Sequence, residues 1–284
     1  MDHKYIDLFD RYTHGSMPRR EFLERLAGLA GSAAAATALL AKLENNYALA
    51  AMVAEDDPRL LVEMVEFATA KGKASGYLVK QKQSGKLPGV IVIHENRGLN
   101  PHIRDVARRM ALEGFLALAP DYLSFSGGTP SNEDEARDRI AKLTDEDILT
   151  ISKAALAFLA SRPECTGKVG AVGFCWGGGV VNRLAVAEPR LAAGVAYYGR
   201  QPPSGQVANI KAAMLLHYAG LDENINKGIA DYEKALKDAG KTYELYVYEG
   251  VNHAFNNDTN EARYNKQAAD LAWSRTVAFL KKYA

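Results

Sequence analysis

The pattern of hydrophobic and polar positions after residue 58 alternates between strand-like and helix-like segments. Residues 60–81 alternate apolar with polar positions around Gly72, which predicts an antiparallel hairpin. The runs "GVIVIHE" (89–95) and "FLALAPDY" (115–122) are typical of strands buried on both faces. Further strands are expected at 168–174, 192–199, 212–219 and 243–250, and helices at 101–115, 146–162, 177–188, 229–240 and 268–284.

This alternation of strand and helix predicts an α/β protein with a mostly parallel central sheet and helices on both faces. Residues 58–284 would form this catalytic domain, preceded by the charged linker "AEDDPR" (54–59). Residues 1–57 would be a helical N-terminal segment and linker. In such sheets reactive groups gather at the carboxyl ends of the strands, so candidate chemistry is sought there.

The N-terminal segment allows two interpretations. Arg19 and Arg20, the uncharged run 27–41 and "ALA" at 48–50 resemble a bacterial twin-arginine export signal, with Ala50 as a candidate cleavage site. The run has about 15 residues, fewer than the roughly 20 of a spanning helix, so no membrane anchor is expected.

The alternative is a retained helical arm that docks on the domain or on a second subunit, as in a homo-oligomer. Glu24 and Arg25 follow the arginine pair closely, and a reactive thiol would be at risk in an oxidising periplasm. Export to the periplasm and retention in the cytoplasm both stay open.

Composition and charge narrow the function classes. The chain has 284 residues, 48% of them apolar and 24% charged, as in ordinary globular proteins. A formal net charge of +1 argues against binding to nucleic acid or to anionic membranes. No zinc-finger, Walker-type or EF-hand spacing is present, and we expect no metal or organic cofactor.

Cys175 lies in a glycine cluster that fits a nucleophile elbow, Gly173-Phe174-Cys175-Trp176-Gly177, between an expected strand and an expected helix. Such a turn strains the central residue and brings main chains so close that only glycine fits. The sulfur would sit at the positive end of the following helix, which favours the thiolate. The alternatives are a cysteine that merely packs in the core and a redox pair with Cys165, although redox pairs usually occur as C-x-x-C.

A thiol nucleophile needs a base and an acid that orients it, and both should follow later strands. Asp222 follows the strand at 212–219, and His253 follows the strand at 243–250. Singly, Asp222 could be a helix N-cap and His253 a loop histidine, but their joint order favours a Cys-Asp-His triad. Asp258 is a rival acid. The other histidines are less favoured, because they lie inside strands, at a helix start or in the N-terminal segment: His3, His14, His94, His102 and His217.

The loop after the first buried strand, "HENRGLN", should supply part of an oxyanion hole. We expect the backbone amides of Asn96 and Trp176 to form it. Glu95 could be a structural group paired with Arg97, or it could accept the proton of the thiol. The residues expected to contact a substrate are Arg97, Tyr122, Phe125, Tyr198 and Arg200.

Over residues 58–284 the chain resembles the dienelactone hydrolase (carboxymethylenebutenolidase) family of the α/β-hydrolase fold. The motifs that carry the resemblance are "HENRGLN", "ALAPDYL", "GFCWGGG", "AYYGRQ", "AGLD" and "GVNHAF". The resemblance implies a Cys175-Asp222-His253 triad, with Glu95 holding the thiol of the free enzyme and helping to form the thiolate when substrate binds.

The resemblance also implies two arginines that grip a substrate carboxylate, but Phe125 and Asn257 stand in their places. Because an unpartnered carboxylate binds poorly, dienelactone itself is not the expected substrate. Arg97 and Arg200 could supply another grip. The sequence therefore predicts a hydrolase of small esters or lactones; the alternatives are a thioesterase or acyl-transfer enzyme, and a non-catalytic binding protein on the same fold.

Overall fold

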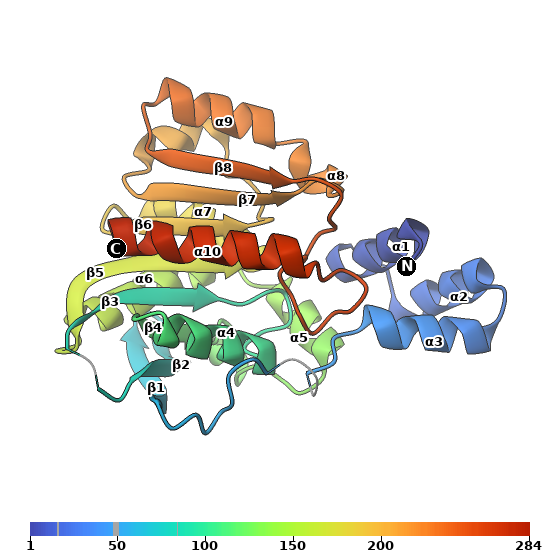
Figure 1. Cartoon of the computed structure of the whole chain (residues 1–284), viewed down its shortest axis with the longest axis horizontal. Helices are drawn as coiled ribbons and strands as arrows, with labels where there is room; N and C mark the ends of the chain where they lie inside the picture. The colour runs from blue at the N-terminus through green and yellow to red at the C-terminus, as the bar shows by residue number, and fades with distance from the viewer. Residues whose placement is uncertain (16, 48–50, 84) are drawn as a thin grey trace.

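A single eight-stranded sheet forms the centre of the computed structural model, which describes residues 1–15, 17–47, 51–83 and 85–284. The order of its strands is β1-β2-β4-β3-β5-β6-β7-β8 (Figure 1). β1 and β2 form the expected antiparallel hairpin, β2 pairs antiparallel with β4, and all other pairs are parallel. The strands are β1 Leu60–Thr69, β2 Gly72–Gln81, β3 Leu87–Ile93, β4 Leu116–Pro120, β5 Cys165–Phe174, β6 Ala193–Tyr197, β7 Ala213–Ala219 and β8 Tyr243–Tyr248.

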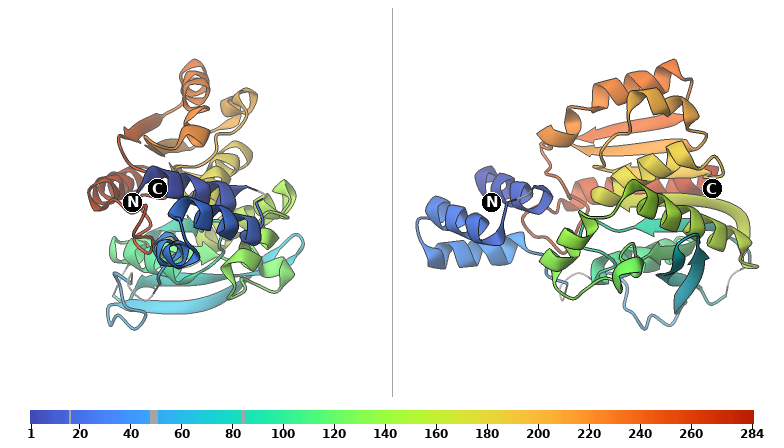
Figure 2. Two further views of the ribbon diagram at one scale, coloured as in Figure 1. Left: turned by 90° about the vertical axis from the view of Figure 1, so that its right-hand side faces the viewer. Right: turned by 180° about the vertical axis from the view of Figure 1, so that it is seen from behind.

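Helices cover both faces of the sheet, which confirms the predicted α/β architecture. α4 and α10 pack on one face, and α6, α7 and α9 on the other (Figures 1 and 2). Each face has its own large apolar cluster. The helices of this domain are α4 Pro101–Leu112, α5 Glu133–Ile140, α6 Asp145–Ser161, α7 Trp176–Ala187, α8 Glu223–Asn226, α9 Ile229–Asp238 and α10 Lys266–Tyr283, with short 3-10 turns at Ser124–Ser126 and Ser204–Asn209.

Three helices form the N-terminal segment: α1 His3–His14, α2 Arg19–Ala30 and α3 Ala33–Leu43. The apolar run 27–41 does not form one continuous helix. Gly31 ends α2 with a positive φ of 80°, and the Ser32 side chain caps α3. No single described helix is long and apolar enough to cross a membrane; α2 and α3 together reach that length and composition, but they are bent by 114°. The candidate cleavage residue Ala50 lies outside the described residues.

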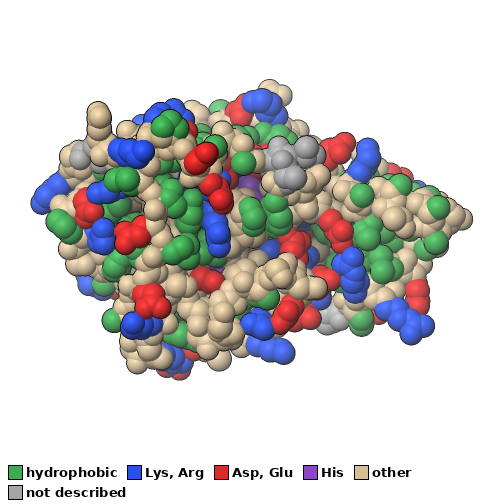
Figure 3. Space-filling model, turned by 90° about the horizontal axis from the view of Figure 1, so that it is seen from below, with side chains coloured by type: hydrophobic (Ala, Val, Ile, Leu, Met, Phe, Trp, Pro, Cys, Tyr) green, Lys and Arg blue, Asp and Glu red, His purple; other side chains and the backbone are tan. Residues whose placement is uncertain are grey.

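The N-terminal segment lies at the edge where the parallel strands end (Figures 1 and 2). Its helices enclose a small apolar cluster of their own, which includes Phe9, Tyr12, Phe22 and Leu26. In the space-filling view the segment projects from the body, and acidic and basic side chains lie where the two meet (Figure 3). The segment thus approaches the sheet edge at which the reactive residues were expected.

Candidate active site

Cys175 occupies a sharp turn between β5 and α7. Its backbone has φ 54° and ψ −115°, a strained conformation for a residue other than glycine. A Cβ on Gly177 would lie 2.5 Å from the carbonyl oxygens of Ile93 and His94, so the start of α7 can approach β3 only because residue 177 is glycine. Cys175 is 8% exposed, and its thiol lies before the first turn of α7, where the helix dipole favours negative charge.

Asp222 and His253 meet beside this turn. Asp222 follows β7 and His253 follows β8, and Asp222 Oδ2 lies 2.5 Å from His253 Nδ1. Asp222 is also the N-cap of α8, accepting a hydrogen bond from the Ile225 amide at 3.2 Å. His253 Nε2 has no hydrogen-bond partner among the described residues, and His253 lines the same cavity as Cys175.

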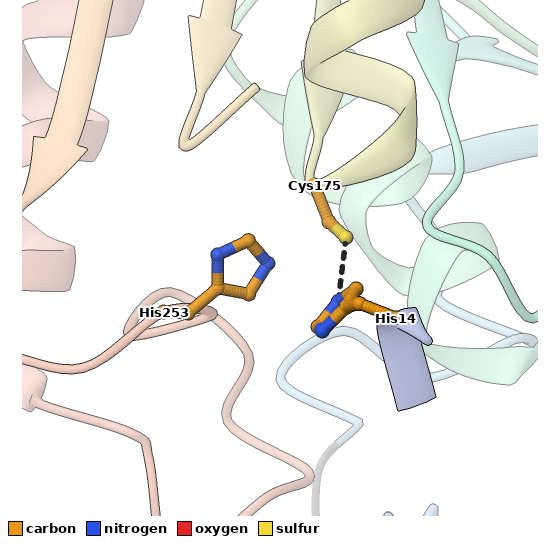
Figure 4. A group of neighbouring side chains, drawn as sticks. All are labelled: His14, Cys175 and His253. Atoms are coloured by element: carbon orange, nitrogen blue, oxygen red, sulfur yellow. Dashed lines mark hydrogen bonds between the residues drawn. The ribbon is translucent and has the colours of Figure 1, made fainter. Parts of the chain in front are cut away.

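A third group, not selected from the sequence, touches the sulfur. His14, the last residue of α1, places Nε2 3.2 Å from Cys175 Sγ (Figure 4). Its ring lies edge-on to that of His253, with centroids 4.7 Å apart. The sequence separates His14 from Cys175 by 161 positions, so no local motif links them. The signal that could have found it is the amphipathic pattern of residues 3–14, which marks a helix that docks.

The two histidines and the carboxylate change the ionisation of the site. Burial raises the pKa of the Cys175 thiol, but the charges of His14 and His253 and the hydrogen bond of His14 outweigh it and lower that pKa to about 6. Burial lowers the pKa of His253, whereas the Cys175 thiolate and Asp222 raise it, and the net direction is well above its ordinary value. Burial raises the pKa of Asp222, but its hydrogen bond with His253 leaves the pKa below the ordinary value. The site therefore favours a thiolate–imidazolium arrangement near neutral pH.

The same three side chains could in principle hold a metal ion. One ring nitrogen of His14, one of His253 and the Cys175 sulfur all lie within 4.8 Å of one another, and zinc accepts such donors. The 3.2 Å between His14 Nε2 and the sulfur is a hydrogen-bond distance, and both Nδ1 atoms have hydrogen-bond partners of their own. We therefore interpret the group as a hydrogen-bonded one.

Glu95 and its neighbours line the small cavity beside Cys175. Glu95 Oε2 accepts a hydrogen bond of 2.8 Å from Asn257 Nδ2, and no hydrogen bond joins it to Cys175 among the described residues. The Arg97 guanidinium donates to Asp134 Oδ1 at 3.2 Å and to the Glu133 carbonyl at 2.9 Å. Glu95 is thus held by Asn257 rather than by Arg97, and Arg97 is paired with Asp134 instead.

The expected oxyanion donors lie on the loop after β3 and at the first residue of α7. The backbone amides of Asn96 and Trp176 donate to no partner among the described residues. The side chain of Asn96 points elsewhere, with Nδ2 donating to the Thr13 carbonyl at 2.8 Å. Both amides are therefore available to a ligand.

The residues expected to contact substrate divide into two groups. Tyr198 and Arg200 line a larger cleft that opens onto Cys175 and His253, and Arg97 lines the small cavity beside the thiol. Tyr122 and Phe125 line neither cavity, contrary to expectation. Tyr122 is fully buried, with its hydroxyl bonded to Ser152, and Phe125 packs against the apolar cluster under α6 and α7. Aromatic residues after a buried strand can complete the core instead of facing the pocket.

The positions of Cys165, Asp258 and the interior histidines decide the other interpretations of the sequence. Cys165 and Cys175 are both free and stand at opposite ends of β5, about 30 Å apart at the usual rise per residue, so the redox-pair interpretation is wrong. The rival acid Asp258 pairs with His102 at 3.0 Å. His94 and His217 are fully buried and hydrogen-bonded, as expected of interior residues.

The fold and this site define a hydrolase of the α/β-hydrolase class. The model of the dienelactone hydrolase family matches residues 74–284, and a short second model, described as YqhI-like, matches residues 2–31. The chain therefore belongs to the dienelactone hydrolase family, whose members act on ester or lactone bonds.

Relatives and solved structures agree with this assignment. A Methylorubrum extorquens protein named "Putative carboxymethylenebutenolidase" is 30% identical over 269 residues, which is 87% of this chain and 92% of that protein. Protein usf of Aquifex pyrophilus is 36% identical over 231 residues, which is 78% of this chain and 98% of that protein. A crystal structure from Klebsiella pneumoniae, described as a "Putative Dienelactone Hydrolase", is 29% identical, has a TM-score of 0.72, and covers 79% of this chain and 99% of that one.

Proposed function

We propose that the protein hydrolyses small carboxylic esters or lactones through a covalent acyl-cysteine intermediate on Cys175. The observation that carries the proposal is the His253–Asp222 hydrogen bond of 2.5 Å beside Cys175, whose strained backbone precedes α7 at the carboxyl edge of the sheet. This is the arrangement of a nucleophile, a base and an orienting acid.

The chemistry proceeds in two halves. The Cys175 thiolate attacks the carbonyl carbon, a C–S bond forms, and the carbonyl π pair moves onto oxygen, where the backbone amides of Asn96 and Trp176 stabilise the oxyanion. The intermediate collapses, the C–O bond to the leaving group breaks, and the alkoxide takes a proton from His253 Nε2. Water then attacks the thioester as His253 takes its proton, and the acid leaves as the thiolate is restored.

The surroundings of the thiol bear on the substrate class. Asn257, in the place of one arginine expected from the family, is neutral and already bonded to Glu95. Arg97 is paired with Asp134. Arg200 lines the larger cleft, and its guanidinium has no partner among the described residues, so it is a cation open to a polar or anionic part of the substrate. These surroundings favour substrates other than dienelactone, whose carboxylate would need the two arginines implied by the family resemblance.

The proposal is tested with short-chain aryl esters and enol lactones. We expect Cys175→Ala to lower turnover at least about a thousandfold, because the acyl-enzyme cannot form. Mass spectrometry of quenched wild-type protein should show an acyl adduct on the peptide that contains residue 175. Cys165→Ala is the matched control, since it removes the other buried thiol from the far end of β5.

Three outcomes are decisive. Turnover by Cys175→Ala equal to that of the wild type would contradict the proposal. An adduct that is released faster to an added alcohol or thiol than to water would identify the acyl-transfer alternative. Wild-type protein that forms no adduct and turns over no substrate would favour the non-catalytic binding protein.

A further inference from the structure

The contact between α1 and the nucleophile gives the N-terminal segment a chemical function. We propose that His14 is a second imidazole of the reaction centre, a catalytic residue that holds the Cys175 sulfur as a thiolate in the free enzyme, and that α1–α3 are therefore part of the active site. This inference rests on the proposed function, because it assumes that Cys175 is the nucleophile.

The hydrogen bonds of His14 orient its ring for this task. Nδ1 lies 3.0 Å from the carbonyl oxygen of Asp10, and a carbonyl only accepts, so Nδ1 carries a hydrogen. Nε2, 3.2 Å from Cys175 Sγ, can then accept the thiol proton and donate it back to the thiolate as a charge-assisted hydrogen bond. His253 has the same arrangement, with Asp222 on Nδ1. Two imidazoles thus present Nε2 toward the sulfur.

Two hydrogen bonds from the sheet domain to the neighbouring residues of α1 fix the position of His14. Asn96 Nδ2 donates to the carbonyl of Thr13 at 2.8 Å, and buried Arg263 donates to Asp10 Oδ1 at 2.7 Å. Asp10, whose carbonyl orients the His14 ring, is therefore bound to the sheet domain through Arg263. The loop that carries a proposed oxyanion amide is tied to α1 in turn, so the docked helix supports two parts of the site.

Glu95 does not provide this contact in the structure. Its carboxylate accepts a hydrogen bond from Asn257, while His14 takes the place beside the sulfur. An imidazole in this position has a consequence that a carboxylate would not have: once protonated it favours the thiolate, whereas a negative carboxylate disfavours it. His253 is then free to serve the leaving group and the attacking water.

His14 leaves the thiol accessible from another side. The larger cleft, lined by Trp176, Tyr198 and Arg200, reaches Cys175 beside the histidine. A substrate carbonyl can therefore approach while the hydrogen bond of His14 remains. If residues 1–50 were removed as an export signal, the thiol would lose its hydrogen bond with His14, and the small cavity beside it would lose Phe9 and Thr13 from its lining.

The test measures the thiol itself and does not require a substrate. The rate of alkylation of Cys175 by iodoacetamide is followed from pH 4 to pH 10 in a Cys165→Ala background, with a chelator present to exclude metal ions. The midpoint of the profile should lie about one unit or more higher in His14→Ala than in the parent protein, because a positive partner of the thiolate is lost. His14→Gln keeps a hydrogen-bond donor without the charge, so its midpoint should also rise, but by less.

Lys4→Ala is the control, because Lys4 is exposed on the same helix and pairs only with Asp2 in an ion pair. It should leave the midpoint unchanged. A midpoint in His14→Ala that stays within about 0.3 unit of the parent value, or falls, overturns the inference. Failure of the proposed function is distinguishable: there Cys175→Ala keeps its ester turnover, whatever the alkylation profile of the His14 variants.

Discussion

The central sheet and the N-terminal helical segment are stabilised in different ways. The sheet buries two large apolar clusters, one on each face, and its strands β3, β4, β6 and β7 are almost wholly buried. The N-terminal segment has one small cluster inside its three helices. Because apolar burial dominates folding free energy, the sheet should determine the stability of the protein and the segment should add little to it.

The contact between the two regions is largely polar. Arg263 binds Asp10, Arg19 binds Asp134, and the Tyr12 hydroxyl donates to Asp134. The Arg19–Asp134 pair is partly exposed and contributes little energy, whereas the Arg263–Asp10 pair is largely buried; the geometry of both is specific. The comparison teaches that the segment is suited to positioning His14 against the sulfur rather than to holding the fold together.

The largest effect expected from this difference is that of Gly177→Ala. The added Cβ would lie 2.5 Å from the carbonyl oxygens of Ile93, at the end of β3, and His94, so α7 or this main chain must shift. Such overpacking costs about 3 kcal/mol, and it displaces the nucleophile as well. Urea unfolding followed by circular dichroism should show a lower midpoint for the whole domain, together with loss of ester turnover. An unchanged midpoint would contradict the close packing at the elbow.

The parts of the fold that were predictable from the sequence are those with local causes. The runs at 89–95 and 115–122 are strands because continuous apolar residues fit a sheet buried on both faces. The elbow at Cys175 could be located because its glycines are needed within a few residues of the thiol. α5 (133–140) was not predicted, because "EDEARDRI" is mostly charged and buries only Ala136 and Ile140.

The predictions that were wrong or missing concern residues whose position depends on packing between segments distant in the sequence. Nothing near Tyr122 in the sequence says that its hydroxyl meets Ser152 in the core. His14 could not be assigned to the site without knowing that α1 docks against Asn96 and Arg263.

A smaller effect is expected from the two arginines of the candidate export motif, which the structure treats differently. Arg19 pairs with Asp134 and Glu44 at 2.9 Å each, whereas Arg20 is 90% exposed and, of the residues that the structure describes, bonds only Glu24. We expect Arg19→Ala to weaken docking by up to about 1 kcal/mol, because the pair is partly screened by solvent. Amide hydrogen exchange in α1–α3 should become faster while exchange in the sheet stays the same.

Arg20→Ala is the matched control for that measurement, and it should leave exchange throughout the segment unaltered. Raising the salt concentration should reproduce part of the Arg19→Ala effect in the parent protein. Equal exchange rates for the two variants would mean that the ion pairs of Arg19 do not hold the segment in place.

The smallest effect is expected from Gly28→Ala, which should stabilise the protein locally, whereas Gly177→Ala should destabilise it. Gly28 is exposed within α2, and a Cβ there would meet nothing within 4 Å, so Gly28→Ala fills empty space and removes the flexibility of glycine from a helix. The substitution should stabilise α2 by about 0.5–1 kcal/mol, seen as slower amide exchange in α2, with the urea midpoint of the sheet unchanged. The same Gly→Ala change would then damage the domain at position 177 and strengthen the segment at position 28. If Gly28→Ala also raised the unfolding midpoint of the sheet, the two regions would unfold as one unit, and the polar docking contacts would be stronger than their exposure suggests.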